Sequence, residues 1–296
     1  MEFALGAAFF YAWSVTCARR SSAHHGPDLA NLGRLLVALV AVGAFVALSG
    51  RQPFSAGWGW LILGGVLGLG VGDVALFHAL PRIGVGLTML LTQCLAAPFA
   101  LVLEYGTLGH APTGPQMAAS LVILTGVAIA LGAPAEGDPA HRQAGVWLGV
   151  LSALGQACGA VSTPLTVHAC EAASQTVPDG FSQAFVRLLG GAPFVAAFLL
   201  WATHGKGLFA KVRRPYATLD ATGWMLMNGL SGPALGVACY QWALTAQPAA
   251  LVLSVVALTP VIALVMQWAV EGDRPPWRLW LGGAVAIAGV VLLRRA

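Results

Sequence analysis

The chain has 296 residues, of which 58% are hydrophobic and only 9% are charged, and its mean hydropathy is +0.78. Because a soluble domain carries about 25% charged residues, this composition excludes a soluble globular domain and predicts a protein that crosses a lipid bilayer several times. The net charge of +4 then concerns the loops and their orientation, and gives no reason to expect nucleic acid as a partner.

Ten apolar runs follow one another along the chain, separated by polar stretches. An apolar helix of about 20 residues crosses the roughly 30 Å hydrocarbon core of a bilayer. The sequence therefore predicts an all-α polytopic membrane protein with ten transmembrane helices. The expected helices span residues 3–18, 29–49, 57–80, 83–104, 113–132, 143–169, 179–202, 219–245, 247–270 and 276–293.

The polar segment 133–142 is a predicted linker between two halves of five helices, 1–132 and 143–296. The halves correspond along their length, and because five is odd, the second half must cross the membrane in the opposite orientation. Such inverted repeats are typical of secondary transporters, whose substrate site lies between the halves near the middle of the membrane. Matched residues include Leu5 and Leu148, Arg34 and Arg187, and Gly126 and Gly289.

The stretch 58–98 holds the most informative pattern of the first half, and 232–260 repeats it approximately in the second half. In the first copy, three glycines four residues apart form a helical stripe that another backbone can approach closely. Asp73 follows them directly, deep inside an apolar run. A carboxylate at that depth costs at least about 2.5 kcal/mol and by default marks a functional site. The glycines are Gly64, Gly68 and Gly72, echoed by Gly232 and Gly236.

Four paired motifs recur in register. They are Arg34 and Arg187 in the second helices, Ala79-Leu80 and Ala243-Leu244 before the third corners, Pro98 and Pro260 in the fourth helices, and Gly126-Val127 and Gly289-Val290 at the ends. With them the chain resembles the drug/metabolite transporter superfamily, specifically proteins with two EamA-type domains. The resemblance covers nearly the whole chain. It implies export of metabolites such as amino acids, or of drugs, although the superfamily also holds importers, exchangers and sugar-nucleotide carriers.

Two positions depart from the pattern of that family, which closes each half with a Gly-Glu and a short turn. The second half has Asp273 at the Glu position, and the first half has His110 there. A role of the family's Glu is therefore not carried over to this chain.

Asp73 is the sharpest candidate for a substrate-binding residue, and Phe77 lies one helical turn further on the same face. A carboxylate in a dry cavity can titrate near neutral pH, which would suit proton coupling. The alternative is a structural Asp bonded to a break in a glycine-rich helix.

Polar and aromatic residues on other predicted helices complete the candidate binding set. Gln93 lies on the face of the fourth helix that also carries Glu104. Gln241 aligns with Phe77 when Gly72 is laid on Gly236. The remaining candidates are Tyr240, beside Gln241, and the aligned pair Trp13 and Gln156. Such groups hold small ligands in cavities, but they equally serve as hydrogen bonds between helices. Arg34 and Arg187, near the starts of their helices, are expected to anchor at the membrane interface.

Two other classes compete with a transporter. The sequence GLSG at 229–232 matches the nucleophile motif of rhomboid-type intramembrane proteases, which need a His on a later helix as base. All seven histidines precede residue 205, and no HExxH or ATP-binding motif occurs, so we expect no enzyme, metal or cofactor. A non-transporting membrane subunit would leave Asp73 unexplained.

Two lines of inference disagree about orientation in the cell membrane. The family resemblance implies cytoplasmic termini. With the N-terminus inside, however, three Lys/Arg residues face the cytoplasm and ten face the other side, and the Lys/Arg bias normally marks the cytoplasm. We therefore expect both termini outside. A monomer and a homodimer stay open. The ten are Arg19, Arg20, Arg82, Arg142, Lys206, Lys211, Arg213, Arg214, Arg274 and Arg278; the three are Arg51, Arg294 and Arg295.

Overall fold

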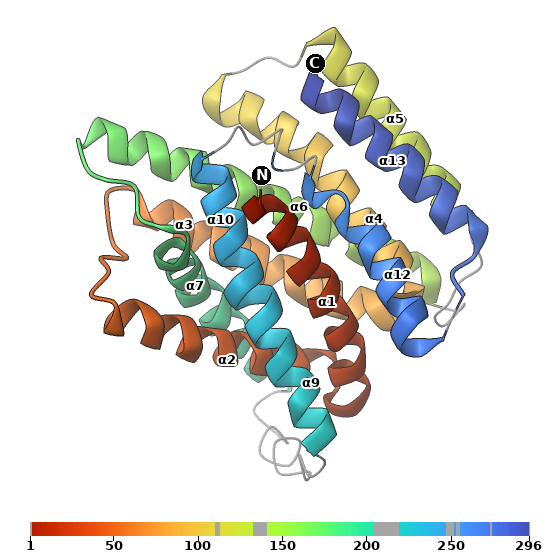
Figure 1. The fold of residues 1–296 in the computed structure, drawn as a ribbon, viewed down its shortest axis with the longest axis horizontal. Helices are drawn as coiled ribbons and strands as arrows, with labels where there is room; N and C mark the ends of the chain where they lie inside the picture. The colour runs from red at the N-terminus through yellow and green to blue at the C-terminus, as the bar shows by residue number, and fades with distance from the viewer. Residues whose placement is uncertain are drawn as a thin grey trace.

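A computed structural model describes residues 2–109, 113–132, 141–203, 219–246, 252, 255–272 and 274–295, and within these ranges every regular element is a helix. Figure 1 shows the helices packed into one body. Most of the predicted linker 133–142, His110, Asp273 and part of the run 247–270 lie outside the described residues.

The helices follow the apolar runs, although α1 and α6 continue past the apolar residues into polar ones. The first half contains α1 (Glu2–His25), α2 (Pro27–Leu48), α3 (Trp58–Gly64), the π-helical η1 (Gly65–Gly72), α4 (Asp73–Leu108) and α5 (Gly114–Leu131). The second half contains α6 (Arg142–Ala172), α7 (Gly180–Ala202), α9 (Leu219–Gly229), the π-helical η3 (Leu230–Gly236), α10 (Val237–Ala246), α12 (Thr259–Glu271) and α13 (Trp277–Arg295).

Side chains that cap the N-terminus of a helix determine where several helices begin. Thr113 precedes α5 and forms a capping box with Gln116, in which each side chain bonds the backbone N–H of the other. Asp179 precedes α7 and accepts hydrogen bonds from the N–H groups of Phe181 and Ser182. These side chains satisfy donors that a helix start otherwise leaves unpaired.

The corner between the third and fourth apolar runs lies at Gly84 and not at the expected Pro81-Arg82. Pro81 continues the helix, whereas Gly84 has φ 75° and ψ 169°, which interrupts α4. A positive φ is costly for residues with a Cβ and costs glycine little, so the chain changes direction at the glycine. The predicted helices, 57–80 and 83–104, had left Pro81 and Arg82 as the corner between them.

The two π-helical elements occupy corresponding places in the two halves. Each lies in a glycine-rich stretch, and each leads into the helix, α4 or α10, that carries candidate site residues. A π-helical turn is uncommon and often marks a functional site.

Helices α5 and α13 pack side by side along one edge of the molecule (Figure 1). A methyl group added to Gly126 would lie 2.4 Å from the backbone nitrogen of Ala286, and one added to Gly289 would lie 2.7 Å from that of Ile123. In the register that pairs Gly126 with Gly289, Ile123 pairs with Ala286. The two contacts are therefore reciprocal, as at an interface between copies related by a two-fold axis.

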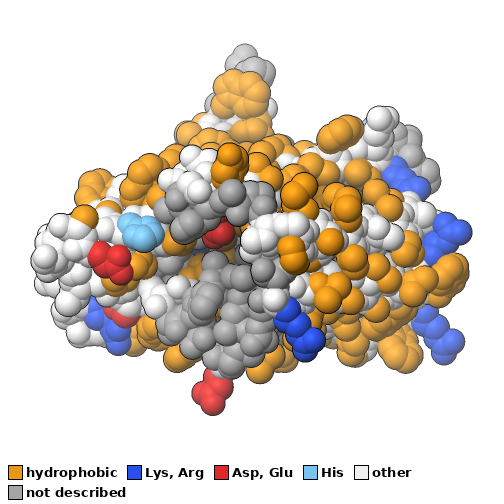
Figure 2. All heavy atoms as spheres, turned by 90° about the horizontal axis from the view of Figure 1, so that it is seen from above, with side chains coloured by type: hydrophobic (Ala, Val, Ile, Leu, Met, Phe, Trp, Pro, Cys, Tyr) orange, Lys and Arg blue, Asp and Glu red, His pale blue; other side chains and the backbone are white. Residues whose placement is uncertain are grey.

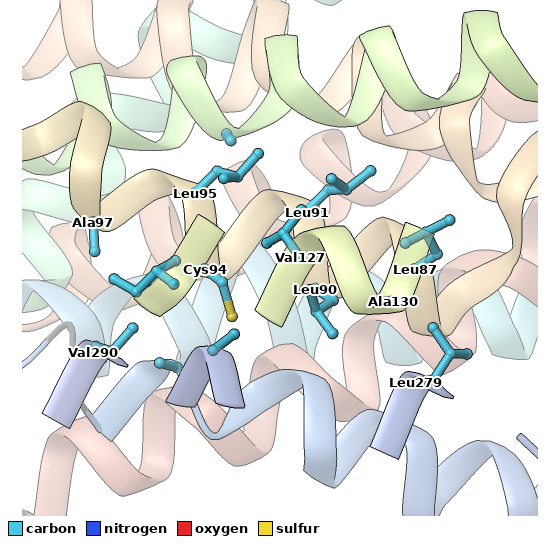
Figure 3. Close-up of a cluster of buried hydrophobic side chains, with 14 of the residues drawn as sticks. Leu87, Leu90, Leu91, Cys94, Leu95, Ala97, Val127, Ala130, Leu279 and Val290 are labelled. Carbon is cyan, nitrogen blue, oxygen red and sulfur yellow. The ribbon is translucent and has the colours of Figure 1, made fainter. Parts of the chain in front are cut away.

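A large apolar core lies under these two helices, with side chains from α4, α5 and α13 meeting in it. Figure 3 shows Leu87, Leu90, Leu91 and Cys94 of α4 beside Val127 of α5, with Leu279 and Val290 of α13 across from them. The core joins helices from both halves of the chain.

The surface is also rich in apolar side chains, as expected of a protein in lipid. Figure 2 shows them over much of one face, with few charged side chains among them. Exposed examples include Phe9, Trp147 and Trp201. Among the described residues, five helices are long and apolar enough to cross a membrane: Pro27–Leu48, Trp58–Thr107, Gly114–Leu131, Arg142–Ala172 and Gly180–Ala202. The protein is therefore an α-helical membrane protein.

Candidate functional site

A cavity lies among helices of both halves and holds at most about 600 Å³ of space, counted out to its open end. Its wall combines apolar side chains with buried polar ones, the usual composition of a small-molecule site. The lining residues are Tyr11, Ser14, Val15, Ala18, Arg34, Leu69, Asp73, Leu76, Phe77, Met89, Gln93, Gln156, Arg187, Gly232, Pro233, Val237 and Tyr240.

Asp73, the first residue of α4, forms a buried ion pair with Arg34 of α2. The residues are 4% and 6% exposed, so the pair is almost fully removed from solvent. The Nε of Arg34 also donates to the Asn31 side chain at 3.1 Å. Its guanidinium carbon lies 4.7 Å from the centre of the Phe77 ring, within cation–π range. Arg34 is thus held on several sides, which keeps the charge of Asp73 fixed in the cavity wall.

Arg187 of α7 lines the same cavity and is 3% exposed. Its Nη2 donates to the carbonyl of Gly64 at 3.5 Å, the long limit of a hydrogen bond. Its Nε has no hydrogen-bond partner, and no ion pair with it occurs among the described residues. The second arginine is therefore buried in the wall without a direct carboxylate partner among the described residues, although the charge of Asp73 acts on it from a distance.

Glycines of η1 and α6 make room for Arg187. A methyl group on Gly65 would lie 2.0 Å from its carbonyl oxygen, and methyl groups on Gly68 and Gly159 would lie 3.0 Å and 2.3 Å from its Nη2. The glycine stripe expected from the sequence thus accommodates an arginine as well as a neighbouring backbone. Any larger residue at Gly159 would move the guanidinium.

Five of the seven residues predicted to bind substrate line this cavity: Asp73, Phe77, Gln93, Gln156 and Tyr240. The Tyr240 ring lies 6.2 Å from that of Tyr11, centre to centre, so α10 and α1 meet through two phenols. The structure brings the five residues together from three helices, α4, α6 and α10, and so from both halves of the chain.

The other two predicted residues lie elsewhere. Gln241 is fully buried and accepts a hydrogen bond from Thr163 of α6 at 2.9 Å, so it joins two helices outside the cavity lining. It neighbours Tyr240, and consecutive helical residues point in different directions. Trp13 of α1 lines a separate hollow with Trp224, whose ring is 6.4 Å away.

The expectation that Arg34 and Arg187 anchor at the membrane interface was wrong. Both are buried in the cavity wall, and their recurrence at equivalent positions was the signal that could have identified them. Ser14 and Asn228 were also missed. They form a buried hydrogen bond of 2.6 Å between α1 and α9, and Ser14 lines the cavity.

Ser231, the serine of the protease-like motif, is buried inside η3. Its hydroxyl donates to the carbonyl of Met227 one turn earlier, at 2.6 Å. The hydroxyl therefore serves the local hydrogen bonding of its own helix. Among the described residues, no three His, Cys, Asp or Glu side chains come together as a metal-binding group would require.

Comparison with known proteins identifies the family to which the chain belongs. The model of the EamA-like transporter family matches residues 2–132 and 144–295. A probable terminal-alkyne amino-acid exporter of Streptantibioticus cattleyicolor is 28% identical over 267 residues, which cover 90% of this chain and 83% of that protein. A solved crystal structure aligns with a TM-score of 0.65 at 17% identity, covering 97% of this chain and 94% of that one, and so shares its fold. The chain belongs to the EamA-like transporter family, whose members are membrane transporters.

Proposed function

We propose that this protein is a secondary transporter that exports small organic solutes, amino acids among them, across the cell membrane through the cavity between its halves. The observation that carries the proposal is the buried Arg34–Asp73 pair in the wall of a cavity lined from both halves. Charged groups at that depth are costly in a membrane protein and by default mark a substrate or ion pathway.

A ten-helix membrane topology is part of this proposal. The apolar helical stretch Trp58–Thr107 has 50 residues, which as one straight helix would be about 75 Å long. That is more than twice the thickness of the hydrocarbon core. The interruption at Gly84 divides it into two arms of suitable length, and this supports two crossings there.

Reciprocal contacts support two inverted halves. The carbonyl of Arg187 faces Gly65, and a methyl group on Gly229 would lie 2.7 Å from the carbonyl of Arg34. Gly65 pairs with Gly229 in the same register that pairs Gly72 with Gly236. Each arginine helix therefore packs against the glycine-rich helix of the other half, as a two-fold relation between the halves requires.

The cavity and the similar protein together support an amino acid as the solute. The Streptantibioticus cattleyicolor protein is named as an amino-acid exporter, and the cavity here offers both signs of charge beside apolar and aromatic side chains. Such a wall suits a small solute with a charged end and an apolar end. Asp73 is the group through which proton coupling would act.

The test measures transport in proteoliposomes and in cells. Cells that express the protein should release amino acids faster than cells without it, and Asp73→Asn should reduce that flux at least about tenfold. Thr125→Ala is the matched control, because Thr125 is exposed on α5 and bonds only its own helix, to Leu121. Unchanged flux in Asp73→Asn would remove Asp73 from the pathway.

Orientation is tested separately. A reporter active only in the cytoplasm, fused after Ala296, should stay silent if the Lys/Arg bias sets the topology with both termini outside. A strong signal would support the orientation that the family implies. Reporters after residue 140 test the ten-helix count, because they must report the side opposite to that of the C-terminus.

A further inference from the structure

Among the described residues, no carboxylate pairs with the second arginine of the cavity as Asp73 pairs with the first. Arg34 is paired with Asp73, bonded to Asn31 and stacked on Phe77. Arg187 is equally buried, yet its Nε has no hydrogen-bond partner among the described residues, and the hydrogen bond from its Nη2 to the Gly64 carbonyl is 3.5 Å long. A buried charge left unpaired is costly, so its retention calls for a partner that arrives from outside the chain.

The sequence register shows why the partner is missing. With Gly72 laid on Gly236, Asp73 falls on Val237, which lines the same cavity. The second half therefore carries an apolar side chain where the first half carries a carboxylate. The described lining then holds two positive groups and one negative group, which leaves one excess positive charge inside the cavity.

We infer that Arg187 is a carboxylate-binding subsite, and that the solutes of this transporter are organic acids or amino acids held there through their carboxylate. The inference rests on the proposed function and deepens it. A planar guanidinium binds a carboxylate through two parallel hydrogen bonds, and the bound carboxylate would supply the charge that Val237 does not.

The surroundings favour an organic carboxylate over a small inorganic anion. Leu69 and Val237 give the cavity an apolar side, while the phenols of Tyr11 and Tyr240 can donate hydrogen bonds. An amino acid uses both surfaces, its side chain on the apolar wall and its carboxylate at Arg187. Chloride or phosphate would use only the polar part.

A binding assay tests the subsite in purified, detergent-solubilised protein. The probes are L-norvaline, L-leucine and L-phenylalanine, each compared with its C-terminal amide, which lacks the carboxylate. Thermal stabilisation should be stronger with the acids than with the amides. Arg187→Gln should weaken the apparent affinity for the acids at least about tenfold, while the amides change by less than about threefold. Equal losses for acids and amides, or no stabilisation of the unaltered protein by any acid, would overturn the subsite.

A second pair of variants keeps the proposal testable if Arg187→Gln does not fold. Val237→Asp introduces the carboxylate that the second half lacks and should compete with the ligand, lowering the preference for acids over amides at least about tenfold. Val237→Asn has the same size without the charge, so that preference should stay within about twofold. Equal effects of the two variants would mean that space and not charge matters, which overturns the subsite. Stabilisation by sodium chloride or phosphate equal to that by the acids overturns it as well.

Transport measurements separate this inference from the proposed function. If the unaltered protein binds the acids through Arg187 but moves none of them in proteoliposomes, the transporter proposal fails and the subsite stands. If flux depends on Asp73 but acids and amides are moved alike, the subsite fails and the transporter proposal stands.

Discussion

The two arginine sites of the cavity occupy equivalent positions in the two halves, but their surroundings differ. Arg34 meets Asp73, whereas Arg187 faces a wall in which Val237 takes the corresponding place. The backbone contacts around the two are alike, since each arginine carbonyl packs against a glycine of the opposite half. The repeat thus preserves the packing of both helices while one side chain changes the charge balance. The same backbone packing thus surrounds an arginine that is paired with a carboxylate, Arg34, and one that has no carboxylate partner among the described residues, Arg187.

The largest expected effect on stability comes from breaking the ion pair between Arg34 and Asp73. Asp73→Asn leaves the buried Arg34 without its carboxylate and should lower the free energy of unfolding by about 3 kcal/mol, because removing one partner of a buried pair leaves an uncompensated charge. Arg187→Gln should lower it by less than about 1 kcal/mol or raise it, since no ion pair is lost. Thermal unfolding in detergent micelles measures both.

The double variant Asp73→Asn with Arg34→Leu is the control, and it should recover much of the stability lost in Asp73→Asn. If Arg187→Gln destabilises the protein as much as Asp73→Asn does, the two sites do not differ in the way described.

The reciprocal contact between α5 and α13 tests whether the halves are equivalent in packing. Gly126→Ala and Gly289→Ala should each lower the free energy of unfolding by about 1 to 3 kcal/mol, and by similar amounts, because both added methyl groups meet backbone atoms. Gly114→Ala, on α5 with no heavy atom within 4 Å of the added methyl group, should be close to neutral. A large difference between the first two would argue against equivalent halves.

Moving Arg187 without removing it gives a smaller effect. In Gly159→Ala the added methyl group would lie 2.3 Å from Nη2 of Arg187. The flexible end of the side chain can shift, so stability should change by less than about 1 kcal/mol, while the preference for acids over amides falls several-fold. In the Arg187→Gln background, Gly159→Ala should have no further effect on that preference. If Gly159→Ala lowers the preference for acids further in the Arg187→Gln background, its effect does not act through Arg187.

The helices that carry the two arginines, α2 and α7, also differ at their starts, and this difference makes the stability of α7 depend on pH. Gly26 precedes α2 without a side-chain cap, whereas Asp179 caps α7. Although burial opposes it, hydrogen bonds from Ser182, Arg51 and the Phe181 N–H lower the pKa of Asp179 below its ordinary value. This stabilisation is present above the unfolded pKa of about 4 and is lost as the pH falls through the lower, folded value.

Asp179→Asn keeps a capping side chain but removes the charge. The variant should therefore be slightly less stable than the unaltered protein near pH 7, by a few tenths of a kcal/mol to about 1 kcal/mol. The difference should shrink as the pH falls from about 5 to about 3. Midpoints of thermal unfolding across that range measure it, and a difference that does not depend on pH would exclude the charge as its cause.

The sequence alone was enough to predict an all-helical membrane protein of the EamA type, because composition and repeated motifs are properties of the chain itself. It also singled out Asp73, because a carboxylate in an apolar run is costly wherever the helix packs. Helix starts such as Thr113 and Asp179 are local too, since capping involves residues only a few positions apart.

The tertiary structure decided which polar groups meet. Arg34 and Arg187 are each followed by two leucines near the starts of their helices. Only the packing of the other helices shows that Asp73 pairs with Arg34, whereas no described carboxylate pairs with Arg187. Similarly, Tyr240 faces the cavity while its neighbour Gln241 bonds Thr163, a choice set by the rotation of α10 against α6. Contacts between residues far apart in the chain depend on helix rotation and packing, and a single sequence does not specify these locally.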